Sequence, residues 1–109
     1  STKMLNAQNF EGETAAGMAL VQFHAEWCGP CRMMLPVVDS LAPELEGRAL
    51  VARVDVDKCQ ELAVKFAINS VPTFVVLRDG RELRRHIGVC SKVDLVKMLE
   101  DEGVLNDGK

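Results

Sequence analysis

Two cysteines separated by two residues, Cys28 and Cys31, are the side chains whose types and spacing most directly predict chemistry. They lie where an apolar run of strand length gives way to a helical pattern. The unpaired N–H groups and partial positive charge of a helix N-terminus favour a thiolate on the first sulfur. Pro30 suits the first helical turn, and Gly29 leaves the approach to the sulfur open. We therefore predict that Cys28 is an exposed nucleophile and Cys31 a buried resolving thiol, as thiol–disulfide exchange through a mixed disulfide requires.

Zinc binding is the competing use of two cysteines at this spacing. A zinc site would need a second pair of Cys or His residues at ligand spacing. The remaining candidates are scattered along the chain and are Cys59, Cys90, His24 and His86. The sequence therefore predicts no metal site.

The sequence pattern predicts that a strand, a helix and a second strand position the two cysteines. Residues 19–24 and 49–54 are apolar runs typical of parallel strands that are covered on both faces. Residues 31–45 carry apolar positions at three- and four-residue spacing, which predicts an amphipathic helix. Pro43 is expected to kink or shorten that helix near residues 39–42. Together these elements predict a right-handed βαβ unit.

A short helix and a hairpin are predicted next. The helix opens with a capping box formed by Asp57 and Gln60. Residues 73–77 are the most strand-like segment, and Asp79-Gly80 supplies the positive φ that a tight hairpin turn needs. The returning strand alternates polar and apolar residues, and its predicted inward face consists of Leu83 and Ile87.

The last predicted helix begins after Ser91, which has Asp94 as its capping partner. Its expected buried residues are Val93, Leu95, Val96, Met98 and Leu99. At the start of the chain we expect a short strand near residues 4–5 and a short helix over residues 10–16. The sum is one α/β domain over residues 1–109, a central mixed β-sheet flanked by helices on both faces, with loose ends at 1–3 and 103–109.

Composition and charge argue against several classes of protein. With 48% hydrophobic and 27% charged residues, the 109-residue chain is typical of globular domains and is not disordered. A net charge of -3 disfavours a nucleic-acid partner. No apolar run approaches the roughly 20 residues of a membrane span, and the start lacks a secretory signal. We expect a cytoplasmic monomer without membrane contact; the start without an initiator Met leaves a removed leader as the alternative.

At these residues the sequence resembles the thioredoxin family, over about residues 10–100. Residues 23–31, Phe-His-Ala-Glu-Trp-Cys-Gly-Pro-Cys, carry the family's active-site motif. Val71-Pro72-Thr73 matches the segment whose proline is held cis beside the active cysteines. Further matches are Val54-Asp55-Val56-Asp57, Asp79-Gly80, Gly88 and Pro36. The resemblance implies the thioredoxin fold.

The resemblance also implies a protein disulfide reductase. Reduced Cys28 would attack a disulfide in a protein substrate, and Cys31 would resolve the mixed disulfide and leave the redox-active disulfide Cys28–Cys31, with no bound cofactor. A thioredoxin-reductase-like flavoenzyme would regenerate the dithiol. The implied substrate platform consists of Trp27, Ser70, Val71, Pro72, Gly88 and Val89, with Gly29 and Pro30 beside it.

Two alternatives share this fold. One is a non-catalytic binding subunit or chaperone, in which the cysteines are incidental. The other is a disulfide isomerase or oxidant, which runs the same chemistry in another direction. Gly29-Pro30 between the cysteines resembles the reducing members, so we favour a reductase.

The chain departs from the family pattern beneath the active site. Gln22 stands where the family usually places a buried aspartate that helps Cys31 lose its proton, and a glutamine accepts no proton. Arg53 stands where the family has a companion lysine, so we expect it to reach solvent or to pair with Asp55, Asp57 or another carboxylate. The resemblance assigns both residues to active-site support, with an altered rate and pH profile of the resolving step.

Three further residues have competing interpretations. His24 projects to the same side as Gln22 and is either a substitute base or a packed, hydrogen-bonded side chain, of which we favour the second. Cys59 shares an apolar stripe with Leu62, so we interpret it as structural. For Cys90 a structural role and an oxidation-sensitive role remain equally open.

Overall fold

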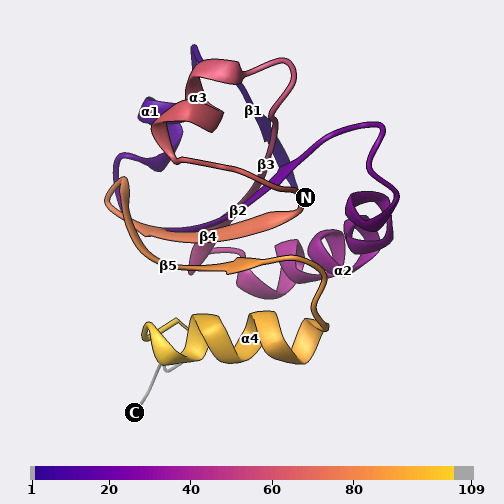
Figure 1. Cartoon of the computed structure of the whole chain (residues 1–109). Coiled ribbons are helices and arrows are strands. Elements are labelled where there is room, and N and C mark those ends of the chain that lie inside the picture. Colours follow the sequence, from indigo (N-terminus) through magenta and orange to yellow (C-terminus); the bar gives the residue numbers. More distant parts are fainter. Residues whose placement is uncertain (1, 105–109) are drawn as a thin grey trace.

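The computed structural model describes residues 2–104, in which a five-stranded sheet lies between two pairs of helices (Figure 1). In chain order the elements are β1 (Lys3–Leu5), α1 (Phe10–Thr14), β2 (Met18–His24), α2 (Gly29–Leu45), β3 (Ala49–Asp55), α3 (Gln60–Lys65), β4 (Thr73–Arg78), β5 (Arg81–Ile87) and α4 (Lys92–Asp101). The strand order is β1-β3-β2-β4-β5. Strands β1, β3 and β2 run parallel, whereas β4 is antiparallel to both β2 and β5. The predicted mixed sheet and parallel βαβ unit are confirmed.

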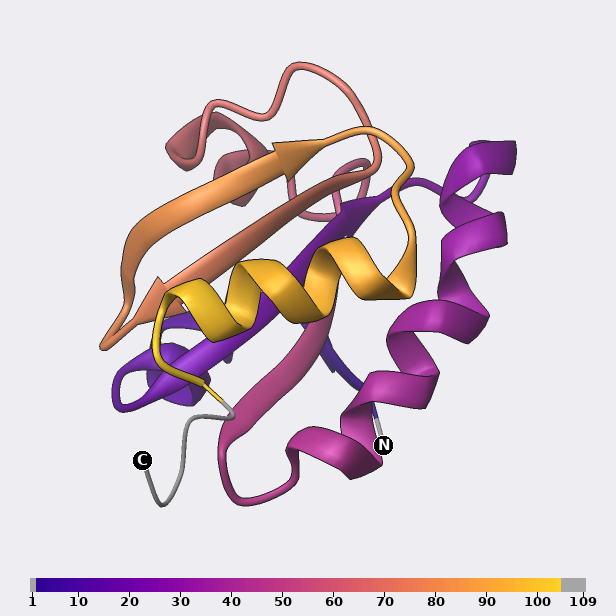
Figure 2. The same cartoon turned by 90° about the horizontal axis from the view of Figure 1, so that it is seen from below.

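Each face of the sheet has its own apolar cluster. Because side chains alternate along a strand, Leu20 of β2 packs with residues of α2 and α4, whereas Val21 and Phe23 pack on the other face with residues of α1 and α3. Figure 2 looks onto the first face, where α4 crosses in front of the sheet and α2 lies beside it. Burial on both sides fixes the carboxyl ends of β2 and β3, next to which the cysteines lie.

The hairpin turn is confirmed, but the strand that follows it differs from the prediction. Asp79 and Gly80 have φ values of 51° and 83°. Leu83 and Ile87, expected to be buried, are 38% and 61% exposed. A β-bulge shifts the register between β4 and β5 beside Val76, which breaks the alternation that the sequence pattern suggested.

The prolines of α2 do not end that helix early. It continues through Pro43 to Leu45, so the predicted shortening near residues 39–42 is wrong. A proline removes one backbone hydrogen bond, but Leu41 and Leu45 on the same stripe are fully buried, and their burial keeps this part helical.

Two predicted helix caps have different outcomes. The capping box of Ser91 and Asp94 is confirmed, with Asp94 N–H donating to Ser91 Oγ at 3.1 Å. The capping box of Asp57 and Gln60 is wrong, because α3 begins after Cys59 and has no side-chain cap. On α4, Val93 is 74% exposed rather than buried.

The ends of the described chain are more ordered than expected. Lys3 belongs to β1, which pairs with β3, and Thr2 donates a hydrogen bond to Asp39. Val104 is buried in the cluster beneath α4. Residues 1 and 105–109 of the expected loose ends lie outside the described residues.

Candidate active site

The two cysteines lie at the N-terminus of α2. Cys28 is the N-cap residue, and a disulfide joins it to Cys31, with the Cα atoms 5.2 Å apart. The Cys31 N–H donates to Cys28 Sγ at 3.2 Å. An N–H group that has no partner within the helix therefore points at the first sulfur, together with the positive end of the helix dipole. In the reduced protein this arrangement stabilises negative charge on Cys28.

The burial of the two sulfurs differs from the prediction. Cys28 is only 4% exposed and Cys31 only 1%, so the expected contrast between an exposed nucleophile and a buried thiol is not present in the disulfide form. The cause is local packing, since both cysteines form a small cluster with Ala25, and Val71 packs against it. Cys28 Sγ lies 3.7 Å from the carbonyl oxygen of Val71, which places the first sulfur against the loop before β4.

That loop contains the cis peptide bond between Val71 and Pro72. The Gly88 N–H donates to Pro72 O at 2.8 Å and so joins the end of β5 to the loop. Val71 and Gly88 are half-buried and Pro72 is buried, whereas Ser70 and Val89 are exposed. The structure thus gathers Cys28, Val71, Pro72 and Gly88.

Ile87, directly before Gly88, is a large exposed apolar side chain that the sequence interpretation assigned to the core. Ile87 pairs with Thr73 at the end of β5, which is an edge strand of the sheet, and the sequence pattern does not show which strand lies at an edge. Ile87 and Val89 are both exposed on the segment that Gly88 ties to the loop.

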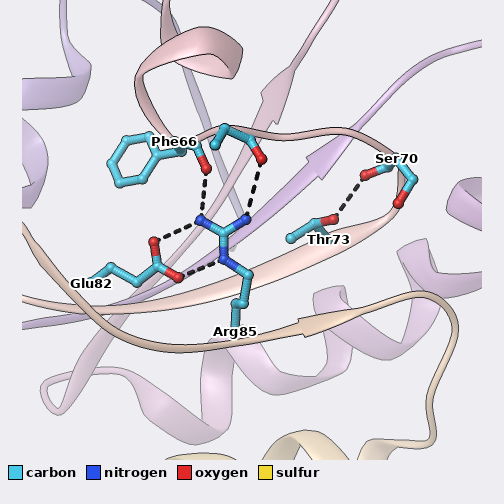
Figure 3. A network of polar contacts seen from close by, with 6 residues as sticks. Phe66, Ser70, Thr73, Glu82 and Arg85 are labelled. Atoms are coloured by element: carbon cyan, nitrogen blue, oxygen red, sulfur yellow. Dashed lines mark hydrogen bonds and ion pairs between the residues drawn. The ribbon is translucent and has the colours of Figure 1, made fainter.

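Arg85 binds the start of the loop that precedes β4. Its Nη2 donates to Phe66 O at 2.6 Å and to Glu82 Oε1 at 2.8 Å, while Thr73 Oγ1 donates to Ser70 O at 2.8 Å (Figure 3). The Arg85 guanidinium lowers the pKa of the Glu82 carboxyl through this hydrogen bond. The sequence analysis did not identify the contact between Arg85 and Phe66, because these residues are 19 positions apart and only the fold brings them together.

Trp27 is 71% exposed but its ring is held in place. Its Nε1–H donates to Asp57 Oδ2 at 2.8 Å. Asp57 was expected to cap α3, and instead it fixes the exposed tryptophan beside Cys28. An apolar ring that is ordered before a partner arrives loses less conformational entropy on binding.

Gln22 lies directly beneath the helix N-terminus. It is fully buried, its Nε2 donates to Cys31 O at 3.4 Å, and its Oε1 has no partner. Arg53, its register neighbour on β3, is half-buried, with Nε buried and unpartnered. Arg53 therefore keeps contact with solvent, which is one of the two predicted alternatives. No pairing of Arg53 with Asp55 or Asp57 is found within residues 2–104, and Asp55 Oδ1 instead accepts the backbone N–H groups of Asp57 and Lys58.

His24 is buried on the same side of β2. The expectation of a hydrogen-bonded histidine is wrong for Nε2, which is buried and has no partner. Burial lowers the pKa of His24 below its ordinary value. His24 and Cys31 both line a pocket of about 170 Å³.

The other two cysteines are free thiols. Cys59 is buried with Leu62 and Phe66, as its structural interpretation predicted. Cys90 is half-buried against the cluster beneath α4. Burial raises the pKa of both thiols, so neither is activated at neutral pH.

Within residues 2–104 no three His, Cys, Asp or Glu side chains lie close enough to hold a metal ion. None of the helices in the same range is both long and apolar enough to cross a membrane.

An aspartate at position 22 is expected to change the pH dependence of disulfide reduction. The side chain there is fully buried and touches the backbone of Cys31, so a carboxyl group would titrate beside the second thiol. Gln22→Asp should add an inflection to the profile of rate against pH, measured with a protein disulfide as substrate. Identical profiles for the two proteins would remove Gln22 from the mechanism.

Comparison with known proteins places these features in a family. The family model described as Thioredoxin matches residues 1–101. The thioredoxin of Chlamydia trachomatis serovar D is 36% identical over 97 residues, which cover 89% of this chain and 94% of the relative. The thioredoxin of Chlamydia muridarum is 38% identical with the same coverage. That of Staphylococcus saprophyticus is 38% identical over 92 residues, or 84% of this chain and 88% of the relative.

Proposed function

The chain belongs to the thioredoxin family and is a thiol–disulfide oxidoreductase that reduces protein disulfides, and we propose that Cys28 is its nucleophile and Cys31 its resolving thiol. The observation that carries this assignment is the hydrogen bond from the Cys31 N–H to Cys28 Sγ at the start of α2. It stabilises an anion on Cys28, which is the N-cap residue, whereas Cys31 lies inside the first turn of the helix.

The proposed reaction transfers two electrons from the dithiol to the substrate. The Cys28 thiolate attacks one substrate sulfur, the substrate S–S bond breaks, and the departing sulfur takes up a proton. The Cys31 thiolate then attacks Cys28 Sγ and releases the second substrate sulfur, which is also protonated. The Cys28–Cys31 disulfide is the product on the enzyme.

We place the substrate against the loop before β4 and the exposed side chains around it. Cys28 Sγ faces the Val71 carbonyl, and a substrate backbone lying along this loop would bring its disulfide to that sulfur. Trp27 and Val89 offer exposed apolar surface, and Ser70, Pro72, Gly88, Gly29 and Pro30 complete the proposed platform.

Membership of the family implies protein disulfide substrates and a reductase partner in general. More specifically, we propose that a thioredoxin-reductase-like flavoenzyme recharges the dithiol, and that the chain acts in electron transport as a cytoplasmic monomer without a bound cofactor. The two cysteines supply the whole two-electron capacity that the reaction needs.

Reduction of insulin, coupled to NADPH and thioredoxin reductase and run across pH, tests this proposal. We expect NADPH to be consumed in proportion to insulin disulfides. A binding subunit would bind partners without consuming NADPH, and an oxidant would show a reduction potential well above that of the reducing members. The first result would overturn the proposed catalytic role of the two cysteines, and the second would overturn the proposed direction of the reaction.

A further inference from the structure

A buried polar cluster occupies the α2 side of the sheet beside Cys31. The register pairs Gln22 with Arg53 and His24 with Asp55, so all four side chains lie on the same face of the sheet. The other side chains on this face, such as Leu20 and Phe74, are apolar. Within residues 2–104, every buried side-chain polar atom without a partner belongs to this cluster, namely Gln22 Oε1, His24 Nε2 and Arg53 Nε. An unsatisfied buried polar atom destabilises a fold, so three in one place require an explanation.

A pocket connects this cluster with the second thiol. It has a volume of about 170 Å³, and both His24 and Cys31 line it. A water molecule takes up about 30 Å³ in the liquid, so the pocket has room for several. Glu26 and Arg32 also line the pocket and are exposed, which gives it a route to bulk water.

The resolving step requires a proton acceptor near Cys31. Cys31 attacks as a thiolate, and its sulfur lies in an almost fully buried environment that disfavours the anion. The Gln22 amide accepts no proton, and Asp55 Oδ1 already accepts two backbone N–H groups. The His24 imidazole is the remaining basic group of the cluster, and its Nε2 has no partner.

We propose that His24 is the proton acceptor for Cys31 in the resolving step, and that water in the pocket lined by both side chains carries the proton from Cys31 Sγ to the His24 imidazole. This inference rests on the proposed roles of Cys28 and Cys31. The Cys31 S–H bond breaks and the imidazole gains the proton. The thiolate then bonds to Cys28 Sγ, the bond between Cys28 and the substrate breaks, and the leaving sulfur keeps the electron pair and takes a proton back through the pocket.

The groups around His24 determine the pH range in which its imidazole can accept a proton. Two groups of β3, Asp55 and Arg53, face the imidazole, as do Glu26 and Lys58 of the neighbouring loops. Two residues of α2, Cys31 and Arg32, line the same pocket. Burial is the largest influence and lowers the pKa of His24, so the imidazole is neutral at pH 7 and able to accept a proton. As pH falls through that pKa, His24 becomes charged and the resolving step slows. The carboxylates of Asp55 and Glu26 stabilise the imidazolium that forms during the step.

Single-turnover kinetics with a protein disulfide test the proposal, because they separate attack by Cys28 from resolution by Cys31. His24→Gln should leave the attack phase unchanged and slow the resolving phase about a hundredfold at pH 7, in the range typical of lost acid–base catalysis. The acid-side fall of the resolving phase should also disappear. His86→Gln is the matched control, since His86 is the other histidine of the chain and lies half-buried on β5.

Rescue distinguishes proton acceptance from a structural role. The double variant Gln22→Asp/His24→Gln should recover part of the resolving rate with a new pH profile, because a carboxylate at position 22 can accept the proton. A resolving phase in His24→Gln equal to that of His86→Gln at every pH would overturn the inference. Equal slowing of both phases without rescue would overturn it as well, whereas a missing attack phase in the wild-type protein would instead refute the role of Cys28.

A measurement on the wild-type side chain covers the case in which His24→Gln does not fold. The His24 imidazole can be titrated by NMR in the reduced protein and in reduced Cys31→Ser. Coupling through the pocket predicts different titration midpoints in the two proteins. Equal midpoints would contradict the proposed proton path.

Discussion

Serine in place of Cys28 is expected to abolish the reduction of protein disulfides. The hydroxyl group is almost fully protonated at neutral pH even at a helix N-terminus, and an alkoxide cannot form the mixed disulfide on which the reaction depends. We expect the turnover of insulin disulfides to fall by at least about a thousandfold. Because serine is nearly isosteric with cysteine and also serves as an N-cap residue, α2 should remain folded.

The matched control is Cys90→Ser, which makes the same atomic change at a half-buried thiol outside the proposed mechanism. It should retain turnover close to that of the wild-type protein. Circular dichroism and the midpoint of urea unfolding would establish that all three proteins are folded. Substantial residual turnover in Cys28→Ser would show that another group starts the reaction.

Serine in place of Cys31 should stop the reaction after the mixed disulfide has formed. Attack by Cys28 needs no side-chain atom of Cys31, and the N–H that donates to Cys28 Sγ belongs to the backbone and is retained. The mixed disulfide should therefore form and persist, since the thiol that would break it has been removed. Multiple turnover should fall by about a thousandfold or more, while one substrate molecule becomes attached to each protein molecule.

Mass spectrometry under non-reducing conditions measures this product directly. The expected mass is that of the protein plus one substrate, and proteolysis should place the link at Cys28. Dithiothreitol should release it. Turnover by Cys31→Ser at the wild-type rate would contradict the resolving role, and a link at Cys59 or Cys90 would contradict the assignment of the nucleophile.

The fold was predictable where the pattern of apolar residues is local and regular. β2 and β3 are nearly continuous apolar runs because both faces of the central sheet are covered, and Asp79-Gly80 marks the hairpin by its backbone conformation alone. The exposure of Leu83 and Ile87 was not predictable, because it depends on the register of β5 against β4 and on which strand lies at the edge of the sheet. The pairing of β5 with β4 and its place at the edge of the sheet are properties of the whole fold, which no short sequence window contains.

The candidate site was predictable to a similar depth. The spacing of Cys28 and Cys31 indicates their chemistry, and the resemblance placed Pro72 beside them. The partner of Trp27 was not predictable, because Asp57 lies 30 residues away and also fits the sequence pattern of a helix cap. The unpartnered Nε2 of His24 escaped prediction as well, since a histidine within a buried strand is usually hydrogen-bonded.

The pH dependence of alkylation at Cys28 tests most directly whether the start of α2 stabilises the thiolate. Reduced protein would be treated with iodoacetamide across pH, with modification at each cysteine measured by mass spectrometry and the urea-unfolded chain as reference. The geometry predicts that Cys28 in the folded protein reaches half-maximal reactivity at a lower pH than the same residue in the unfolded chain. A midpoint equal to or above that of the unfolded chain would show that the helix terminus does not activate this sulfur.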